Sequence, residues 1–240
     1  QQGVRFIGDP HLDSPNHDRE LLIRDLEQMK ADNDIGVVMG DIWSMILPSD
    51  LKRYTAGRHG DTRDNIINDA VDSAFEILRP YVDHIDVILL GNHETNVIKR
   101  HHVDPVALLI DRLNQVKTTG ALSTQRIAYG GYTCYLQFQF LYSANGKRSK
   151  STSNIVWLHH GRGGGAPVTK GMIDANRIMV SRHADLYVIG HKHTAISDHS
   201  RFEYVDGHGQ LKRVPRDFVV VGGYSGATPE DDPDSEGYTL

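Results

Sequence analysis

Five short apolar runs, each ending at a cluster of polar residues, restrict the fold of this sequence more than any other feature. The runs span residues 4–7, 35–39, 87–90, 155–158 and 186–189. Their length and their content of Val, Ile and Leu are typical of strands buried on both faces. Segments with helical periodicity lie between them, as in Leu22, Leu26 and Met29. This alternation predicts βαβ units and a partly parallel sheet.

The residues that follow these runs are carboxylates, imidazoles and an amide. They read GDPH at 8–11, GD at 40–41, GNHE at 91–94, HHG at 159–161 and GHKH at 190–193. Strand residues two apart point the same way, so His191 and His193 would face one point. Open α/β sheets bind ligands at the carboxyl ends of their strands, and imidazole is the commonest protein metal ligand. The five clusters together therefore predict one metal site, which a single H-x-H would not.

The ordered series of clusters resembles the motifs of the calcineurin-like metallophosphoesterases, which are D-x-H, G-D-x-x-D/E/H, G-N-H-D/E, H and G-H-x-H. The resemblance runs from Phe6 to His193. It implies an α/β fold, a four-layer α/β/β/α sandwich of two mixed β-sheets flanked by helices. We expect a single domain over 1–240, with an inserted loop at about 45–64 and an acidic tail at about 229–240.

The resemblance also implies two divalent metal ions and seven ligands. The ligands are Asp9, His11, Asp41, Asn92, His160, His191 and His193. The first, second and last of these would hold one ion, and Asn92, His160 and His191 the other, with Asp41 bridging both. Oxygen ligands mixed with imidazole suit Mn²⁺, Fe or Zn²⁺. Mn²⁺ is our first expectation, with Zn²⁺, Fe or Ni²⁺ as alternatives.

Either His159 or His160 could be the metal ligand of the fourth motif. Adjacent strand residues point to opposite faces, so only one of the two is expected to bind a metal. We choose His160, because it directly precedes Gly161 and so matches the H-G form of the motif.

The resemblance implies metal-dependent hydrolysis of phosphoesters. Two cations lower the pKa of a bridging water, so that hydroxide is available as nucleophile. His93 would be the catalytic acid, and we expect Glu94 to orient its ring. At Ser44 the family often has an acid or a histidine that supports the site from outside. Leu90 precedes the GNHE motif, where the protein-serine/threonine phosphatases carry an arginine.

We therefore expect a phosphodiesterase that acts on nucleic acid or a small diester. The alternatives are a phosphomonoesterase acting on a small phosphate or phosphoprotein, and a non-catalytic binding module with the same fold. The net charge of -5 disfavours a broad electrostatic grip on nucleic acid. The phosphate would then be held by local charge. Arg162, in the glycine-rich segment after His160, is the expected substrate-binding residue, and a merely flexible loop is the alternative for this segment.

Two further patterns concern location and topology. No long uncharged apolar run is present, and Cys134 is the only cysteine, so we expect no membrane association, no internal disulfide and a cytoplasmic location. The sequence begins at Gln1 and not at a methionine, so a removed N-terminal leader remains an alternative. Polar and apolar residues alternate from Gln125 to Leu141, and Gly130-Gly131 suits a hairpin turn between two antiparallel strands. We interpret residues 145–153 as a polar linker.

Overall fold

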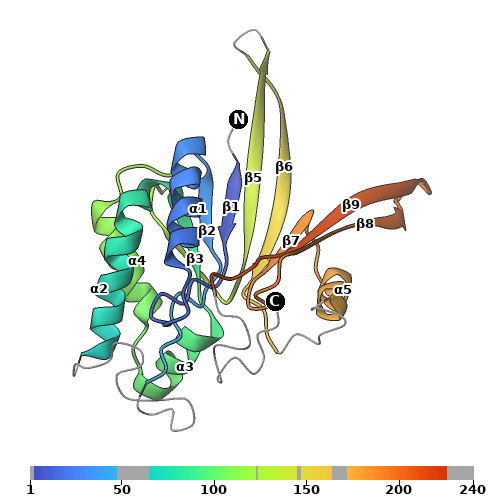
Figure 1. Ribbon diagram of the computed structural model, residues 1–240. Coiled ribbons are helices and arrows are strands. Elements are labelled where there is room, and N and C mark those ends of the chain that lie inside the picture. The colour runs from blue at the N-terminus through green and yellow to red at the C-terminus, as the bar shows by residue number, and fades with distance from the viewer. Residues whose placement is uncertain (1–2, 48–64, 123, 145–146, 164–171, 226–240) are drawn as a thin grey trace.

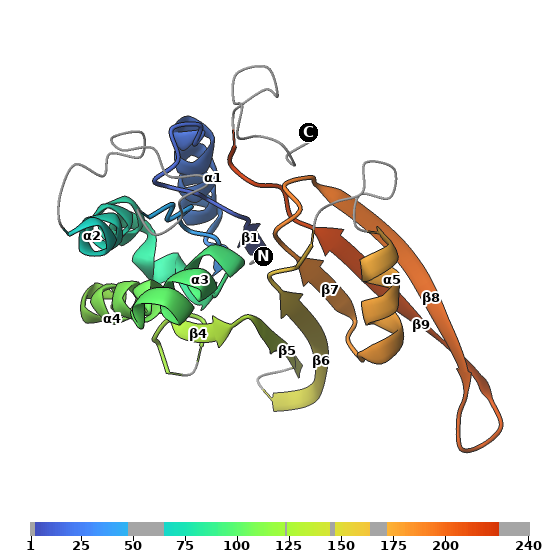
Figure 2. The same ribbon diagram turned by 90° about the horizontal axis from the view of Figure 1, so that it is seen from below.

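The computed structural model describes residues 3–47, 65–122, 124–144, 147–163 and 172–225. Most of the predicted inserted loop and all of the predicted acidic tail lie outside these ranges. The described chain forms four layers, with helices outside two facing sheets (Figures 1 and 2). This confirms the expected α/β/β/α sandwich. None of the described helices is both long and apolar enough to cross a membrane.

The first sheet has the strand order β1-β2-β3-β4, and all its neighbours are parallel. Its strands are β1 (Val4–Ile7), β2 (Ile35–Val38), β3 (Ile85–Leu89) and β4 (Ala128–Gly131). Every residue of β3 is buried. Both faces of this sheet are covered, which explains the continuous apolar runs of the sequence.

The second sheet has the order β5-β6-β7-β9-β8 and is mixed. Its strands are β5 (Thr133–Ala144), β6 (Lys147–His159), β7 (Leu186–Ile189), β8 (Ile196–Val205) and β9 (Leu211–Val220). The pairs β6–β7 and β7–β9 are parallel, and the pairs β5–β6 and β8–β9 are antiparallel. The expectation of mixed sheets therefore holds for this sheet, whereas the first sheet has only parallel pairs.

Six helical segments complete the described fold. They are α1 (Arg19–Asp32), α2 (Ile66–Leu78), the 3-10 helix η1 (Arg79–His84), α3 (Asn92–His101), α4 (Pro105–Val116) and α5 (Met172–Ser181). Helices α1, α2 and α4 pack their buried side chains against the outer face of the first sheet. Helix α5 covers the outer face of the second sheet through Met179, which packs with Trp157 and Phe218. Val37, Met39 and Val87 meet Val156 and Leu158 between the sheets.

Two topological predictions were wrong. Gly130-Gly131 does not join two antiparallel strands, because β4 pairs with β3 in the first sheet and β5 pairs with β6 in the second. Gly131 has a φ of 62°, and the chain passes there from one sheet to the other. The predicted linker at 145–153 is largely part of β6. An alternation of polar and apolar residues indicates a strand with one solvated face, but it does not indicate which strand pairs with it.

Candidate metal centre

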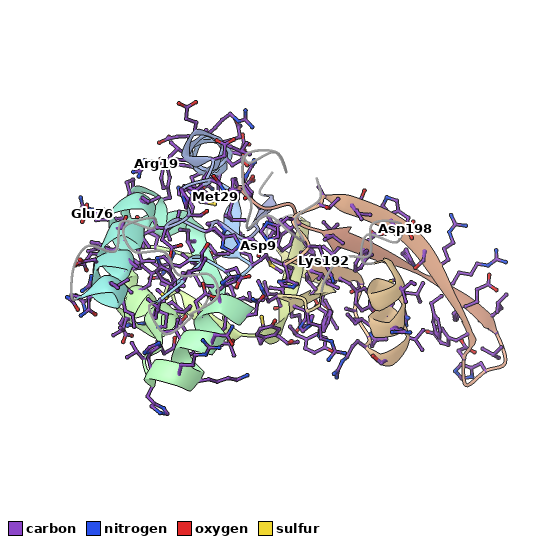
Figure 3. The ribbon with its side chains drawn as sticks, turned by 60° about the horizontal axis from the view of Figure 1, so that its bottom comes forward. Asp9, Arg19, Met29, Glu76, Lys192 and Asp198 are labelled. Atoms are coloured by element: carbon purple, nitrogen blue, oxygen red, sulfur yellow. The ribbon has the colours of Figure 1, made fainter. Side chains whose placement is uncertain are left out.

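The parallel strands of both sheets end at one rim, and the eight predicted metal-ligand and catalytic residues follow those ends. Asp9 and His11 follow β1, Asp41 follows β2, and Asn92 and His93 begin α3 after β3. His160 follows β6, and His191 and His193 follow β7. In Figure 3, Asp9 and Lys192 lie near each other where the helix-covered half meets the second sheet. The structure thus brings together residues that are up to 184 positions apart (9 to 193).

Asp41 lies at the centre of the cluster. Its Oδ2 atom is 3.1 Å from His160 Nε2 and 3.8 Å from His191 Nδ1. The same oxygen is 3.9 Å from His93 Nε2. The side chain is buried, with only 1% of its surface exposed. One carboxylate is therefore within reach of imidazoles from both sheets.

The backbone itself is unusual at the predicted ligands. Asp9, His11, Asp41, His191 and His193 have φ angles of 28°, 46°, 45°, 69° and 51°. Side chains other than glycine rarely adopt positive φ, and each case costs on the order of 1–3 kcal/mol. Nine non-glycine residues of the described chain have positive φ, and five of them are these predicted ligands. Such a concentration of strain is typical of functional sites.

The start of α3 stabilises the charge of Asp41. Asp41 Oδ1 accepts a hydrogen bond of 3.0 Å from the backbone N–H of His93, in the first turn of the helix. The partial positive charge of a helix N-terminus favours an anion there. Burial acts to raise the pKa of Asp41, but hydrogen bonds from His160 and His191 outweigh it and hold the pKa well below its usual value. Gly91 allows this approach, because a Cβ at that position would lie 2.0 Å from Asp41 Oδ1.

Asp9 is the second buried carboxylate of the cluster. Its Oδ2 accepts a hydrogen bond of 2.6 Å from the backbone N–H of His191. Among the described residues, its Oδ1 has no hydrogen-bond partner. Burial, joined by the negative charge of Asp41, raises the pKa of Asp9 to about 8. Two adjacent buried carboxylates repel each other unless cations compensate their charge, so this pair favours a cation site.

The amide of Asn92 gives a direct test of whether a cation fits. One of its terminal atoms lies 3.1 Å from Asp41 Oδ2, 2.7 Å from His191 Nδ1 and 3.1 Å from His160 Nε2. In the orientation of the structure this atom is the oxygen and faces the Asp41 carboxylate; a turned amide would instead donate to Asp41 and to the two imidazoles. Ligand atoms about 2.1 Å from one ion lie about 3 Å apart at adjacent corners of its coordination shell. The spacing of these atoms therefore fits a divalent cation.

His160 belongs to this cluster, and its neighbour His159 does not. His160 Nδ1 lies 2.8 Å from the carbonyl oxygen of Met39, which can only accept, so Nδ1 carries the proton and Nε2 faces Asp41. Burial opposes the imidazolium, but the hydrogen bond with Asp41 raises the pKa of His160 to about 9. His159 instead contacts Thr133 Oγ1 at 2.6 Å and stacks on Trp157. The position of His160 in the cluster agrees with its choice over His159, and its role as a metal ligand remains a prediction.

The cluster divides into two groups that share Asp41. The ligand atoms of His11, Asp41 and His93 lie within 4.8 Å of one another, as do those of Asp41, His160 and His191. His11 Nε2 has no hydrogen-bond partner among the described residues. Burial holds the pKa of His11 well below its usual value, so its ring is neutral, as a metal ligand must be. The division agrees with the idea of two ions bridged by one carboxylate.

His193 lies beside the first group. Its ring stacks on that of His11 with centroids 5.2 Å apart, and its Nε2 is 3.9 Å from Asp9 Oδ2. Burial lowers the pKa of His193 to about 4. The structure therefore places Asp9 and His193 next to the first group, as predicted for one ion, and it adds His93 to that group.

The predicted role of Glu94 was wrong. Its carboxylate does not contact the ring of His93, but accepts backbone N–H groups of Gly91, Asp41 and Trp43 at 3.0–3.2 Å. Glu94 is the third residue of α3, and a side chain there turns back onto the start of the helix. Burial, joined by the charge of Asp41, raises the pKa of Glu94 to about 8. Glu94 thus ties the second motif to the third.

Ser44 and Asp13 are supporting residues whose contacts the sequence did not reveal. The carbonyl oxygen of Ser44 accepts a hydrogen bond of 2.7 Å from His93 Nδ1, and its hydroxyl lies 3.1 Å from His11 Nδ1. Asp13 holds this segment through the backbone N–H of Ser44 and of Met45. The only signal in the sequence was the departure from the family motif at Ser44, which gave no partner.

Arg162 lies at the edge of the cluster. The residue is exposed, and its carbonyl oxygen accepts a hydrogen bond of 2.9 Å from Lys192 Nζ. Its side chain borders a pocket that adjoins the site. This position is compatible with the predicted contact to a substrate, which stays a prediction.

Comparison with known proteins agrees with this geometry. The family model described as calcineurin-like phosphoesterase matches residues 4–195, which is most of the chain and includes the whole cluster. Among curated proteins, no significant match to the chain was found.

Proposed function

Because this chain belongs to the calcineurin-like phosphoesterase family, we propose that it is a phosphodiesterase that depends on two divalent metal ions, with Mn²⁺ first and Zn²⁺, Fe or Ni²⁺ as alternatives. The proposed ligands are Asp9, His11, Asp41, Asn92, His160, His191 and His193. The observation that carries the proposal is the meeting of the Asn92 amide with Asp41 and two imidazoles at distances of 2.7–3.1 Å.

Bound cations would supply a nucleophilic water of lowered pKa and would offset negative charge on the phosphoryl oxygens. The protein's own residues prepare that chemistry. The Met39 carbonyl fixes the tautomer of His160, so that Nε2 faces the cluster. Asp41, buried and low in pKa, keeps its charge across the physiological range. These two residues are thus held in the orientation that the proposed ligand roles require.

His93 is the proposed general acid. The Ser44 carbonyl fixes the proton on His93 Nδ1, so Nε2 faces the cluster, 3.9 Å from Asp41 Oδ2. A protonated Nε2 can donate its hydrogen to the ester oxygen that leaves as the P–O bond breaks. The neutral ring then recovers a proton from solvent. The fixed Nδ1–H explains how the ring keeps this orientation through the cycle.

The diester is preferred over the monoester because Leu90 stands where the protein phosphatases of the family carry an arginine. The test compares bis-p-nitrophenyl phosphate with p-nitrophenyl phosphate, using protein stripped by chelation and reloaded with Mn²⁺. We expect faster turnover of the diester, dependent on metal. Faster turnover of the monoester would overturn the diester preference, and full activity in the stripped protein would overturn metal dependence.

A matched pair of variants checks the site itself. Asp41→Asn should abolish hydrolysis and metal binding together, whereas Asp111→Asn, an exposed change on α4 with the same loss of charge, should alter neither. A wild-type protein that binds no metal would instead indicate a non-catalytic binding module.

A further inference from the structure

A pocket beside the metal cluster has no role in the mechanism above. Its lining residues lie at or just beyond the ends of β6, β7 and β9 and on α5. Figure 2 shows α5 beside these strands. Gly161 and Lys192 line the pocket, and each directly follows a proposed ligand, His160 or His191. The pocket holds about 500 Å³ of empty space, counted with its part open to solvent. The pocket therefore adjoins the reaction centre.

The rim of the pocket is positively charged. Arg162, Arg177 and Lys192 line it, and none of its described lining residues is acidic. Lys192 Nζ donates to the carbonyl oxygens of Arg162 and Gly163 at 2.9 and 2.7 Å, which holds the loop after β6 against the loop after β7. An ammonium bonded to carbonyls keeps its full charge. Because the whole chain has a net charge of -5, this concentration of cations is a local feature.

The inner wall of the pocket is apolar and partly aromatic. Ile189, Phe218 and Val220 line it and belong to the core under α5. His159 also faces the pocket, and its ring is fixed by stacking on Trp157 at a centroid distance of 5.1 Å and by the contact with Thr133. An apolar wall with a flat ring suits a planar group, and a cationic rim suits an anion.

We propose that this pocket binds the ester arm of the substrate that carries a planar ring and a second phosphate, as in a phosphorylated nucleoside. The inference rests on the proposed diesterase function and adds a substrate class to it. The rim would hold the second phosphate through guanidinium hydrogen bonds, and the partly exposed ring of His159 would contact the planar group. A diester arm without the extra phosphate would lose the contacts to the rim.

The test uses the p-nitrophenyl ester of thymidine 5′-phosphate with and without a 3′-phosphate, on the full chain in Mn²⁺. We expect kcat/KM to be about tenfold higher for the 3′-phosphorylated ester through a lower KM, as for one charge-assisted hydrogen bond at a partly exposed site. Arg177→Gln should remove this preference. Arg182→Gln, an exposed change just beyond α5 that does not line the pocket, should keep it.

Calorimetric binding separates this inference from the proposed function. Wild type should bind thymidine 3′,5′-bisphosphate about tenfold more tightly than thymidine 5′-phosphate, and Arg177→Gln should bind both alike. If wild type hydrolyses bis-p-nitrophenyl phosphate but has equal kcat/KM for the two thymidine esters, the proposed role of the pocket is wrong and the proposed function stands. A preference retained in Arg177→Gln would also overturn the proposed role of the pocket. A binding preference without any diester hydrolysis would support the pocket and overturn the function.

Discussion

Replacing Ser44 with alanine separates the support of one proposed ligand from the support of the proposed acid. The change removes the hydroxyl 3.1 Å from His11 Nδ1 but leaves the carbonyl oxygen that accepts from His93 Nδ1 at 2.7 Å. Loss of a partner that orients a metal-ligating histidine weakens metal binding by about 10- to 100-fold. Because Ser44 is only partly buried and makes one contact to His11, we expect the lower end, about tenfold.

The assay is calorimetric titration of stripped protein with Mn²⁺, comparing wild type, Ser44→Ala and the exposed control Ser73→Ala. We expect one of two binding steps to weaken in Ser44→Ala, because His11 belongs to one of the two groups that share Asp41. At saturating Mn²⁺, kcat should stay near that of wild type, since the contact to His93 is made by the main chain. Equal weakening of both steps, or no change in either, would refute this reasoning.

Two other predictions concern the acid and the buried ionisable groups. His93→Gln should lower kcat by about 10²- to 10⁴-fold with unchanged metal content measured by plasma mass spectrometry; lost metal would make His93 a ligand instead. Stripped protein should lose stability between pH 6.5 and 8, measured by urea unfolding. In this range the unfolded chain has released the protons of Asp9 and Glu94 and is losing that of His160, whereas the folded chain keeps them up to a pKa of about 8, 8 and 9. The lowered pKa values of His11 and His193 oppose this mainly at the lower end of the range, because unfolded histidines lose their protons near pH 6.5. The folded state binds more protons, so the free energy of unfolding falls as pH rises, by on the order of 1–3 kcal/mol. A free energy of unfolding that rises over this pH range would contradict the raised pKa values of these three groups.

The sequence predicted the position of the cluster because each of its parts is local. An apolar run indicates a buried strand, and parallel neighbouring strands end at the same edge, so Asp9 and Asp41 meet once β1 and β2 are parallel. His191 follows β7 in the second sheet, and the packing of the two sheets brings it to the same place. The four layers followed from the family resemblance, and the packing of α5 against the second sheet agrees with it.

What could not be predicted depends on contacts between segments. Glu94 binds backbone N–H groups of the second motif rather than a side chain, and backbone groups leave no pattern in the sequence. The contact of the Ser44 carbonyl with His93 was missed for the same reason, because it too is made by a backbone group. The strand after Gly131 joins the other sheet. This could not be predicted, because an alternating pattern does not specify which strand is the neighbour. The pocket combines Arg162 with Arg177 and Phe218, which only folding brings together.

The metal content of purified protein tests the central claim most directly. Plasma mass spectrometry after reloading with Mn²⁺ and dialysis should find two equivalents per chain in wild type and none in Asp41→Asn, because Asp41 is the residue common to both groups. Two equivalents in both proteins, or less than one in wild type, would contradict a pair of cations shared by that carboxylate.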